Sequence, residues 1–190
     1  MKLISLLERL EYTCLQGSTE QEVKNVIYDS RKVEEGSLFI CIRGAVVDGH
    51  KFVPDVIAKG AKVLVVEEAV EAPEDVTVIL VEDSRYAMAF ISAAYFGYPA
   101  EKLKTIGITG TKGKTTTTYM VKSILENAGY KVGLIGTIEA IIGDKVIPAK
   151  NTTPESYVIQ EYFHEMVEAG CDCVVMEVSS QGLMLHRTQG

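Results

Sequence analysis

Residues 110–116 read Gly-Thr-Lys-Gly-Lys-Thr-Thr, and this run limits the possible folds more than any other part of the chain. The apolar stretch 105–109 before it predicts a buried strand, and apolar residues at helical spacing within 117–128 predict a helix after it. A strand, a glycine loop, a Lys-Thr pair and a helix in this order are typical of a phosphate-binding loop, in which backbone N–H groups and a helix N-terminus face the anion. We therefore expect an α/β fold with a parallel sheet that presents this loop.

In such a loop, Lys114 would reach the terminal phosphates of a nucleotide and the Thr115 hydroxyl would bind Mg²⁺. The spacing is shorter than in the general phosphate-binding loop, because Gly110 leaves two residues before the Gly113-Lys114 pair. Two other interpretations are a glycine-rich turn without a ligand and a nucleic-acid patch built on Lys112 and Lys114. A formal net charge of −7 disfavours the second, because binding a polyanion needs a basic surface.

Glu177 follows the apolar residues 173–176, which predict a buried strand. In open α/β sheets ligands bind at the carboxyl ends of the strands, so we expect Gly110 and Glu177 to meet over one sheet. An acid in this place is typical of the Walker-B type, which holds Mg²⁺ directly or through water. The alternative is an ordinary surface glutamate at the end of a strand.

The length of 190 residues predicts one large or two small domains, and a hydrophobic content of 47% is ample for buried cores. The acidic balance argues against general DNA or RNA binding and against an anionic membrane surface. No stretch approaches the roughly 18 consecutive apolar residues of a membrane span. Residues 1–12 include Glu8 and Glu11, so we expect an amphipathic first helix instead of a signal peptide. These features predict a cytoplasmic monomer that neither binds nucleic acid nor inserts into a membrane.

The four cysteines are Cys14, Cys41, Cys171 and Cys173. Cys41 lies in an apolar strand pattern, and one residue separates Cys171 from Cys173 where a common zinc knuckle has two. We expect reduced thiols in place of zinc ligands or structural disulfides.

The remaining periodicity predicts alternating strands and helices on both sides of the phosphate loop. Before it, we expect strands over 37–42, 62–66 and 76–81 and helices over 52–59 and 84–96. After it, we expect a strand over 131–137, a hairpin over 138–147 that turns at Gly143-Asp144, and a helix over 155–169. Gly97-Tyr98-Pro99 breaks the pattern and predicts a boundary between a domain of residues 1–98 and one of residues 99–190.

Five motifs, in order along nearly the whole chain, resemble the Mur ligase family. They are Asp29-Ser30-Arg31 with Gly36-Ser37-Leu38-Phe39, Arg43-Gly44 with Asp48-Gly49-His50-Lys51-Phe52, the loop Thr109–Thr116, Asn151-Thr152-Thr153-Pro154, and Met176–Leu183 with His186-Arg187. The resemblance implies a small uridine-binding α/β domain followed by part of a phosphate-loop ATPase domain with a parallel sheet. It also explains the short spacing of the loop, although Lys112 stands where the family often has asparagine.

Carried over position by position, the resemblance implies that Ser30 contacts the uridine diphosphate and that Tyr28, Ala45, Val46 and Val47 line that site. The ATP phosphates would lie against Gly110, Thr111, Lys112, Gly113, Lys114, Thr115 and Thr116. Lys114 and Glu177 would be catalytic, and Mg²⁺ would be held by Thr115 and Glu177. The muramoyl substrate would face Asn151, Thr152, Thr153, Ser179 and Arg187.

The implied activity is that of an ATP-dependent amide ligase of peptidoglycan synthesis. The last two motifs resemble the branch that adds the third amino acid, meso-diaminopimelate or L-lysine, to UDP-N-acetylmuramoyl-L-alanyl-D-glutamate. ATP would phosphorylate the terminal carboxylate, and the incoming amine would attack the acyl phosphate. The family's carbamylated lysine, a further metal-binding histidine and the domain that binds the amino acid would lie past Gly190. We therefore expect the isolated chain not to be a competent ligase.

Two other functions stay open at this point. A stand-alone binding module would hold a UDP-sugar in its first domain and a nucleotide in its second, without chemistry. A phosphotransferase acting on a small molecule would use the phosphate loop and would not need the region around Asp29-Ser30-Arg31.

Overall fold

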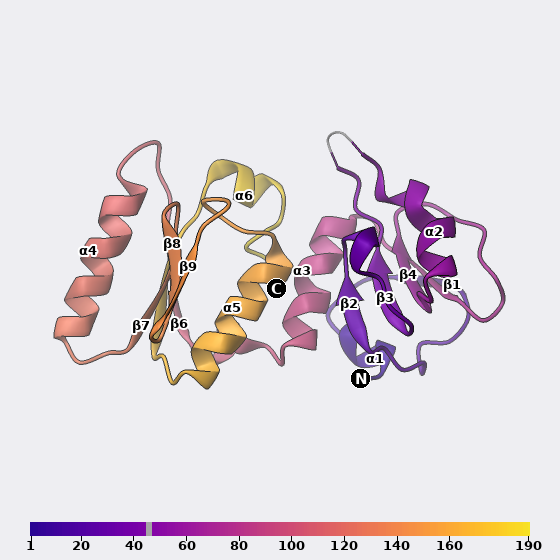
Figure 1. Cartoon of the computed structure of the whole chain (residues 1–190), viewed down its shortest axis with the longest axis horizontal. Coiled ribbons are helices and arrows are strands. Elements are labelled where there is room, and N and C mark those ends of the chain that lie inside the picture. The colour runs from indigo at the N-terminus through magenta and orange to yellow at the C-terminus, as the bar shows by residue number, and fades with distance from the viewer. Residues whose placement is uncertain (45–46) are drawn as a thin grey trace. The chain divides into compact units, whose positions relative to one another are not determined.

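The computed structural model describes residues 1–44 and 47–190. The chain divides into two compact units, Met1–Tyr95 and Phe96–Gly190, each with its own sheet (Figure 1). Both sheets contain parallel strands and both are covered by helices, so the prediction of an α/β fold is confirmed. Ala45 and Val46, two of the residues expected to line the uridine site, lie outside the described residues.

In the first unit, the strands that the structure describes form a five-stranded sheet in the order β1-β5-β4-β3-β2. Its strands are β1 (Thr13–Gln16), β2 (Asn25–Ile27), β3 (Ser37–Ile40), β4 (Val63–Val66) and β5 (Thr77–Leu80). Its helices are α1 (Leu3–Leu6), η1 (Ser30–Lys32), η2 (Gly49–Phe52), α2 (Val53–Ala58) and α3 (Ser84–Tyr95). Neighbouring strands run parallel except β1, which pairs antiparallel with β5.

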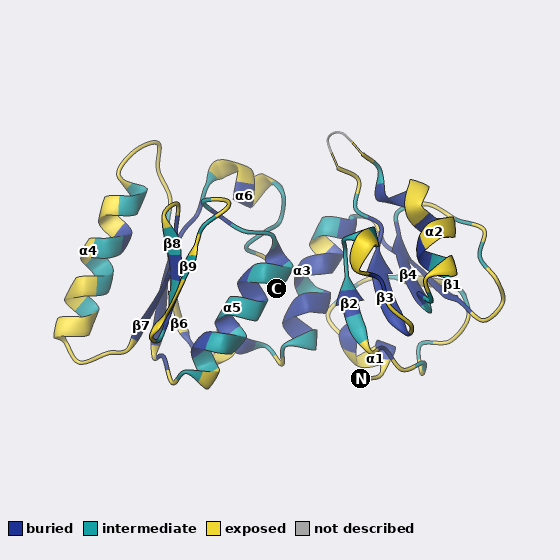
Figure 2. Ribbon diagram, in the orientation of Figure 1, coloured by how far each residue is buried: buried dark blue, intermediate teal, exposed yellow. Residues whose placement is uncertain are grey.

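The core of this unit lies on both faces of the two central strands. Every residue of β3 and β4 is buried, as expected for parallel strands covered on both sides (Figure 2). Phe39 and Leu64 pack in one cluster with Val53 and Val56 of α2. Helix α3 has a long buried stripe, because its apolar and small residues repeat at helical spacing.

The amphipathic helix expected over residues 1–12 is wrong in extent, since α1 is a single turn. The Leu3 side chain is fully buried, but the backbone N–H groups of Leu3 and Ile4 donate to Gln21 at 2.9 Å and to Thr19 at 2.8 Å. A helix leaves its first N–H groups without an internal partner, so these tertiary bonds fix where the turn starts. The short strands β1 and β2 were not predicted, because neither contains the apolar run that marked the other strands.

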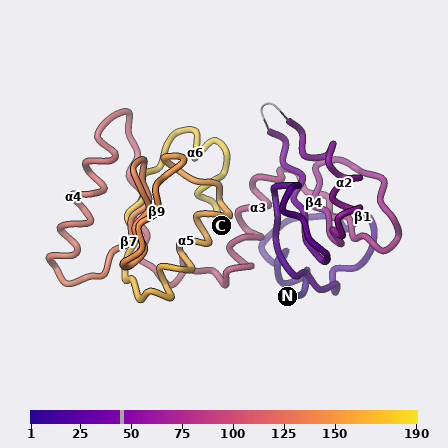
Figure 3. The backbone as a smooth tube through the Cα atoms, in the orientation of Figure 1, coloured from indigo at the N-terminus to yellow at the C-terminus, as the bar shows by residue number. Residues whose placement is uncertain are grey.

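In the second unit, the described strands form a five-stranded sheet in the order β6-β10-β7-β8-β9. Its strands are β6 (Lys104–Ile108), β7 (Val132–Ile135), β8 (Glu139–Ile142), β9 (Lys145–Pro148) and β10 (Cys173–Glu177), and its helices are η3 (Pro99–Lys102), α4 (Lys114–Asn127), α5 (Ser156–Glu168) and α6 (Ser180–Met184). Strand β10 is parallel to both β6 and β7. Figure 3 follows the chain from β7 through the antiparallel pair β8–β9, which confirms the expected hairpin.

Helices α4 and α5 cover opposite faces of this sheet (Figure 1). Val174 and Met176 of β10 pack in the cluster that includes α5, whereas Cys173 and Val175 pack in the cluster that includes Val121 of α4. Successive side chains of a strand point to opposite faces, so the side chain of Glu177 belongs to the α4 face.

Helix α4 begins three residues earlier than the expected range 117–128, at Lys114. Gly113 is its N-cap and has a φ of 81°, a left-handed conformation that glycine adopts without steric strain. Lys114 and Thr115 therefore belong to the first helical turn. The outer side of the helix carries exposed apolar side chains, with Met120 60% and Ile124 65% exposed (Figure 2).

Across residues 1–44 and 47–190, no helix has the length and apolar character needed to cross a bilayer.

Candidate functional site

The glycine loop connects β6 to the first turn of α4. Gly110 has a φ of 148° and Gly113 one of 81°, so the loop turns at positions where glycine is favoured. The Lys114 side chain folds back across the loop, and its Nζ donates to the backbone oxygen of Gly110 at 2.8 Å. Lys112, Thr111 and Thr116 are exposed. The first-turn N–H groups of the helix and the Lys114 ammonium thus lie at one end of α4, the arrangement that binds a phosphate.

Glu177 is the acid of this site, and only 1% of its surface is exposed. Its Oε1 accepts from the Thr137 backbone N–H at 2.8 Å, and its Oε2 lies 3.1 Å from both the Thr115 Oγ1 and the Thr137 Oγ1. A buried carboxylate is costly unless hydrogen bonds replace its water, and these donors provide that replacement. Glu177 is therefore built into the loop end of the sheet, not placed on the surface.

Gly136 leaves the space that the carboxylate occupies. A Cβ at this position would lie 2.6 Å from the Glu177 Oε1, which is closer than real Cβ atoms approach an oxygen. The Gly136 N–H also donates to the Glu139 backbone oxygen at 3.0 Å, which starts the hairpin beside the site. The absence of a side chain at residue 136 therefore lets Glu177 lie against the end of β7.

The segment 151–154 lies against the same strand ends. The Thr153 side chain is buried, and its Oγ1 donates to the Glu177 backbone oxygen and accepts from the Ser179 N–H, both at 3.0 Å. The Thr152 Oγ1 lies 3.1 Å from the Thr137 Oγ1. Asn151 is exposed, and the half-buried Ser179 uses its Oγ to cap α6 by accepting from the Gly182 N–H at 3.0 Å. Thr152, Thr153 and Ser179 therefore lie around the end of β10.

Arg187 fixes the far side of this segment. Its guanidinium donates to the Thr153 backbone oxygen at 2.9 Å and to the Glu155 Oε1 at 2.6 Å. Both side chains of the ion pair are mostly buried, with exposed fractions of 13% for Arg187 and 22% for Glu155. Pairing of this kind positions the segment as well as carrying charge.

Tyr119 of α4 holds a second carboxylate, that of Glu139, near Glu177. Its hydroxyl donates to the Glu139 Oε1 at 2.8 Å. Burial, followed by this hydrogen bond and by the charges of Glu139 and Glu177, raises the pKa of Tyr119 to about 12. The phenol therefore stays protonated at neutral pH and remains a donor that holds Glu139 against α4.

The oxygen atoms at this site fit Mg²⁺, which prefers hard oxygen ligands and keeps several waters. The Thr115 hydroxyl and the Glu177 carboxylate are 3.1 Å apart at the mouth of the glycine loop. Within the described residues, no three His, Cys, Asp or Glu side chains gather into an all-protein metal site.

The remaining predicted site residues belong to the first unit. Ser30 begins η1, and its backbone oxygen accepts from the Lys59 Nζ at 2.9 Å. Tyr28 is half-buried just after β2, whereas Val47 is 49% exposed and its backbone oxygen accepts from the Gly44 N–H at 3.0 Å. Arg31 forks onto both carboxylate oxygens of Asp29, at 2.9 and 2.7 Å.

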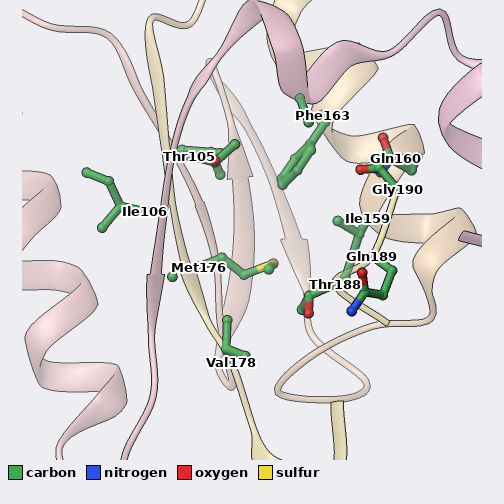
Figure 4. Close-up of a pocket in the computed structure, with 13 residues that line it drawn as sticks. Thr105, Ile106, Ile159, Gln160, Phe163, Met176, Val178, Thr188, Gln189 and Gly190 are labelled. Carbon is green, nitrogen blue, oxygen red and sulfur yellow. The ribbon is translucent and has the colours of Figure 1, made fainter. Parts of the chain in front are cut away.

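A cavity of about 240 Å³ lies in the second unit, lined by β6, β10, α5 and the segment 188–190 (Figure 4). Met176 and Val178 point into it, together with Ile159 and Phe163 of α5. Met176 of β10 and Val178 just after it flank Glu177 in the sequence, so the cavity is on the face of the sheet opposite the carboxylate. It is therefore not part of the Thr115–Glu177 site.

The structure adds residues to the site that the sequence interpretation did not name. Thr137 and Gly136 contact the Glu177 carboxylate, and Tyr119, Glu139 and Glu155 form the surrounding hydrogen bonds. Thr137 was detectable in principle, because it follows the strand β7, whose carboxyl end lies at the same edge as that of β10. The pair Tyr119–Glu139 left no such pattern, since it joins a helix to a hairpin.

Two family profiles match the chain. The profile described as Mur ligase family, catalytic domain, matches residues 22–96, and that described as Mur ligase middle domain matches residues 108–190. A UDP-N-acetylmuramoyl-L-alanyl-D-glutamate--2,6-diaminopimelate ligase from Clostridium perfringens is 53% identical over 190 residues, which are 100% of this chain and 39% of that protein. The chain thus spans well under half the length of this curated relative.

Solved structures show the same fold. A UDP-N-acetylmuramoyl-L-alanyl-D-glutamate--2,6-diaminopimelate ligase has a TM-score of 0.81 at 23% identity, over 100% of this chain and 38% of that chain. A MurF ligase from Thermotoga maritima, solved in complex with ADP, has a TM-score of 0.53 at 23% identity, over 83% of this chain and 32% of that chain. With the two profiles placed in order along its two units, the chain belongs to the Mur ligase family and carries its N-terminal and middle domains.

Proposed function

We propose that this chain is the UDP-sugar-binding and ATP-binding part of an amide ligase of peptidoglycan synthesis. The ligase would extend UDP-N-acetylmuramoyl-L-alanyl-D-glutamate by a third amino acid. The name of the Clostridium perfringens relative favours 2,6-diaminopimelate over L-lysine as that amino acid. A reaction that consumes ATP and a UDP-linked precursor would take place in the cytoplasm.

One observation supports this proposal above the others. The Thr115 hydroxyl, in the first turn after the glycine loop, lies 3.1 Å from the buried Glu177 carboxylate. These two oxygens come from positions that are 62 residues apart, and the parallel pairing of β10 with β6 brings them together. A glycine-rich turn that binds nothing would have no need of a buried acid beside its helix, so this pairing argues for Mg²⁺ and a nucleotide.

In the proposed reaction, each residue of the loop has a separate task. The loop N–H groups would hold the ATP phosphates, and Lys114 would leave the Gly110 oxygen to neutralise charge on the transferred phosphoryl group. Thr115 and Glu177 would hold Mg²⁺, which supplies charge stabilisation for the phosphates. Activation of the carboxylate as an acyl phosphate is needed, because a carboxylate is itself a poor electrophile.

Each unit would hold a different part of the substrate. In the second unit, Asn151, Thr152 and Ser179 would contact the muramoyl peptide, while Thr153 and Arg187 would hold that segment in place. In the first unit, Ser30, Tyr28 and the segment 45–47 would hold the uridine diphosphate. The proposed domains are residues 1–98 for the UDP-sugar and residues 99–190 for ATP.

Calorimetric titrations of the whole chain test the proposal. ATP is titrated with and without Mg²⁺, and UDP and UDP-N-acetylmuramoyl-L-alanyl-D-glutamate are titrated separately. We expect Mg²⁺ to strengthen ATP binding and both uridine ligands to bind at a second site. A chain that binds ATP but neither of the uridine ligands would favour a phosphotransferase. A chain that binds neither ATP nor a uridine ligand would contradict the proposed function.

A further inference from the structure

Thr137 lies between two parts of the site that the proposed function assigns to different ligands. Its backbone N–H donates to the Glu177 Oε1 at 2.8 Å. Its Oγ1 is 3.1 Å from the Glu177 Oε2 and 3.1 Å from the Thr152 Oγ1. One residue at the end of β7 thus contacts both oxygens of the acid and the hydroxyl of the neighbouring segment.

The direction of these hydrogen bonds follows from the number of protons available. An ionised carboxylate only accepts, whereas a hydroxyl has one proton to donate and two lone pairs with which to accept. The Thr137 proton must therefore go to Glu177, and the Thr152 proton must go to the Thr137 oxygen. The result is a directed chain from Thr152 through Thr137 to Glu177.

The surrounding backbone holds this chain in place. Gly136, directly before Thr137, has no Cβ to displace the Glu177 Oε1. Thr153, directly after Thr152, is fastened to the Glu177 backbone oxygen at 3.0 Å. The segment 152–153 thus reaches Glu177 twice, through Thr137 to the carboxylate and directly from Thr153 to the backbone oxygen.

We propose that Thr137 is a positioning residue, which aims the Glu177 carboxylate at the Mg²⁺ site and relays the orientation of the Thr152 hydroxyl to it. This inference rests on the proposed function, since it assumes that Glu177 serves Mg²⁺. Thr137 itself would touch neither nucleotide nor metal. Its effect would be transmitted by the carboxylate, whose position the hydroxyl restricts.

The test uses Thr137→Val, which removes the hydroxyl and keeps both the shape of the side chain and the backbone N–H. Removal of a group that orients a metal ligand typically lowers metal affinity about 10–100-fold. We therefore expect the gain in ATP affinity on adding Mg²⁺ to fall about tenfold, with the affinity for ATP alone unchanged. Thr137→Ser should restore the gain, and Thr117→Val, on the exposed side of α4, should leave it unchanged.

The relay is tested by combining Thr137→Val with Thr152→Val. The single change at residue 152 should give a smaller loss of the Mg²⁺ effect, and no further loss should appear once residue 137 is valine. The inference would be overturned if the two losses of the Mg²⁺ effect added in full in the double variant, or if Thr137→Val kept the wild-type Mg²⁺ effect. In either case, Mg²⁺-dependent ATP binding by the wild type would still support the proposed function. Equal losses with and without Mg²⁺ would show a purely structural role and would also overturn it. A wild-type chain whose ATP binding ignores Mg²⁺ would overturn both proposals.

Discussion

The Thr153 hydroxyl donates to the backbone oxygen of Glu177 at 3.0 Å, so the segment that follows the β8–β9 hairpin is fastened to the end of β10. The same hydroxyl accepts from the Ser179 N–H, and the carbonyl of Thr153 accepts from Arg187. The proposed substrate segment and the proposed metal ligand therefore share one set of hydrogen bonds. A change that moves one of them is expected to move the other.

Lys114→Ala should weaken the binding of ATP much more than the binding of ADP. A lysine at this position addresses the terminal phosphates, and a hydrogen bond to a charged group is worth roughly 1.5–3 kcal/mol. Calorimetry with both nucleotides in Mg²⁺ measures the difference. Lys122→Ala is the matched control, because Lys122 lies on the same helix and pairs with Glu126. Equal losses for the two nucleotides would contradict the proposed role.

Glu177→Gln should remove most of the effect of Mg²⁺ on ATP binding and leave metal-free binding nearly unchanged. Glutamine keeps the shape and one acceptor oxygen, but it loses the charge that attracts the cation. ATP titrations at several Mg²⁺ concentrations measure the loss, and thermal unfolding checks that the variant folds. A variant that responds to Mg²⁺ like the wild type would show that Glu177 has only a structural role.

Ser30→Ala should weaken the binding of UDP without affecting that of ATP. The residue starts a 3-10 turn whose backbone is held by Lys59, so the loss of the hydroxyl should not unfold the turn. We expect a decrease of about 5–10-fold, the usual effect of one neutral hydrogen bond. Ser5→Ala, at an exposed position of α1, serves as the control. Unchanged UDP binding would show that this turn is not part of the uridine site.

Alkylation of the native chain at pH 8 should label one thiol quickly. All four cysteines are free, but only Cys14 is exposed. Burial, with the charges of Asp48 and Glu67, raises the pKa of Cys41 to about 12, and burial also raises that of Cys173. Since the thiolate is the reactive form, these thiols should react only after unfolding. Mass spectrometry gives the count, and rapid labelling of Cys14→Ser would contradict the expectation.

Arg31→Met should lower the free energy of unfolding only slightly at pH 7, because it breaks an exposed ion pair with Asp29. The Arg31 side chain, through its hydrogen bonds, lowers the pKa of Asp29 from 3.8 to about 2. A lowered carboxyl pKa stabilises the fold above pH 3.8, and this stabilisation is lost as the pH falls towards 2. Urea unfolding at pH 7, 5 and 3 should therefore show a difference between variant and wild type that is constant at first and smaller at pH 3.

Local patterns predicted much of the second unit. The stretch 105–109 and the glycine run after it predicted a strand, a loop and a helix, and the apolar residues before Glu177 predicted the strand that delivers it. The prediction that the first of these strands is buried is wrong, because β6 lies at an edge of the described sheet and none of its residues is buried. The expected start of α4 was three residues late, because an interpretation based on apolar spacing ignores Lys114 and Thr115 in the first turn. The hairpin turn at Gly143 was visible because glycine and aspartate between apolar runs favour a turn.

Contacts between distant segments could not be predicted in the same way. The N–H groups of Leu3 and Ile4 donate to Gln21 and Thr19, and no local pattern records these contacts. Tyr119 and Glu139 meet because α4 lies over β7 and its neighbours. Thr153 was expected to face the substrate, and only the structure shows that its hydroxyl already bonds Glu177 and Ser179.

The alternation along β10 constrains the protein in a way that no substitution would reveal. Met176 faces the cluster that includes α5, and Glu177 faces Thr115. Which side chain reaches which face therefore depends on the number of residues in the strand before it. Deleting a single residue within β10 would turn the carboxylate towards the apolar layer and a thioether towards the glycine loop. Such a deletion would abolish packing and metal binding together, so the length of this strand should tolerate less variation than its composition.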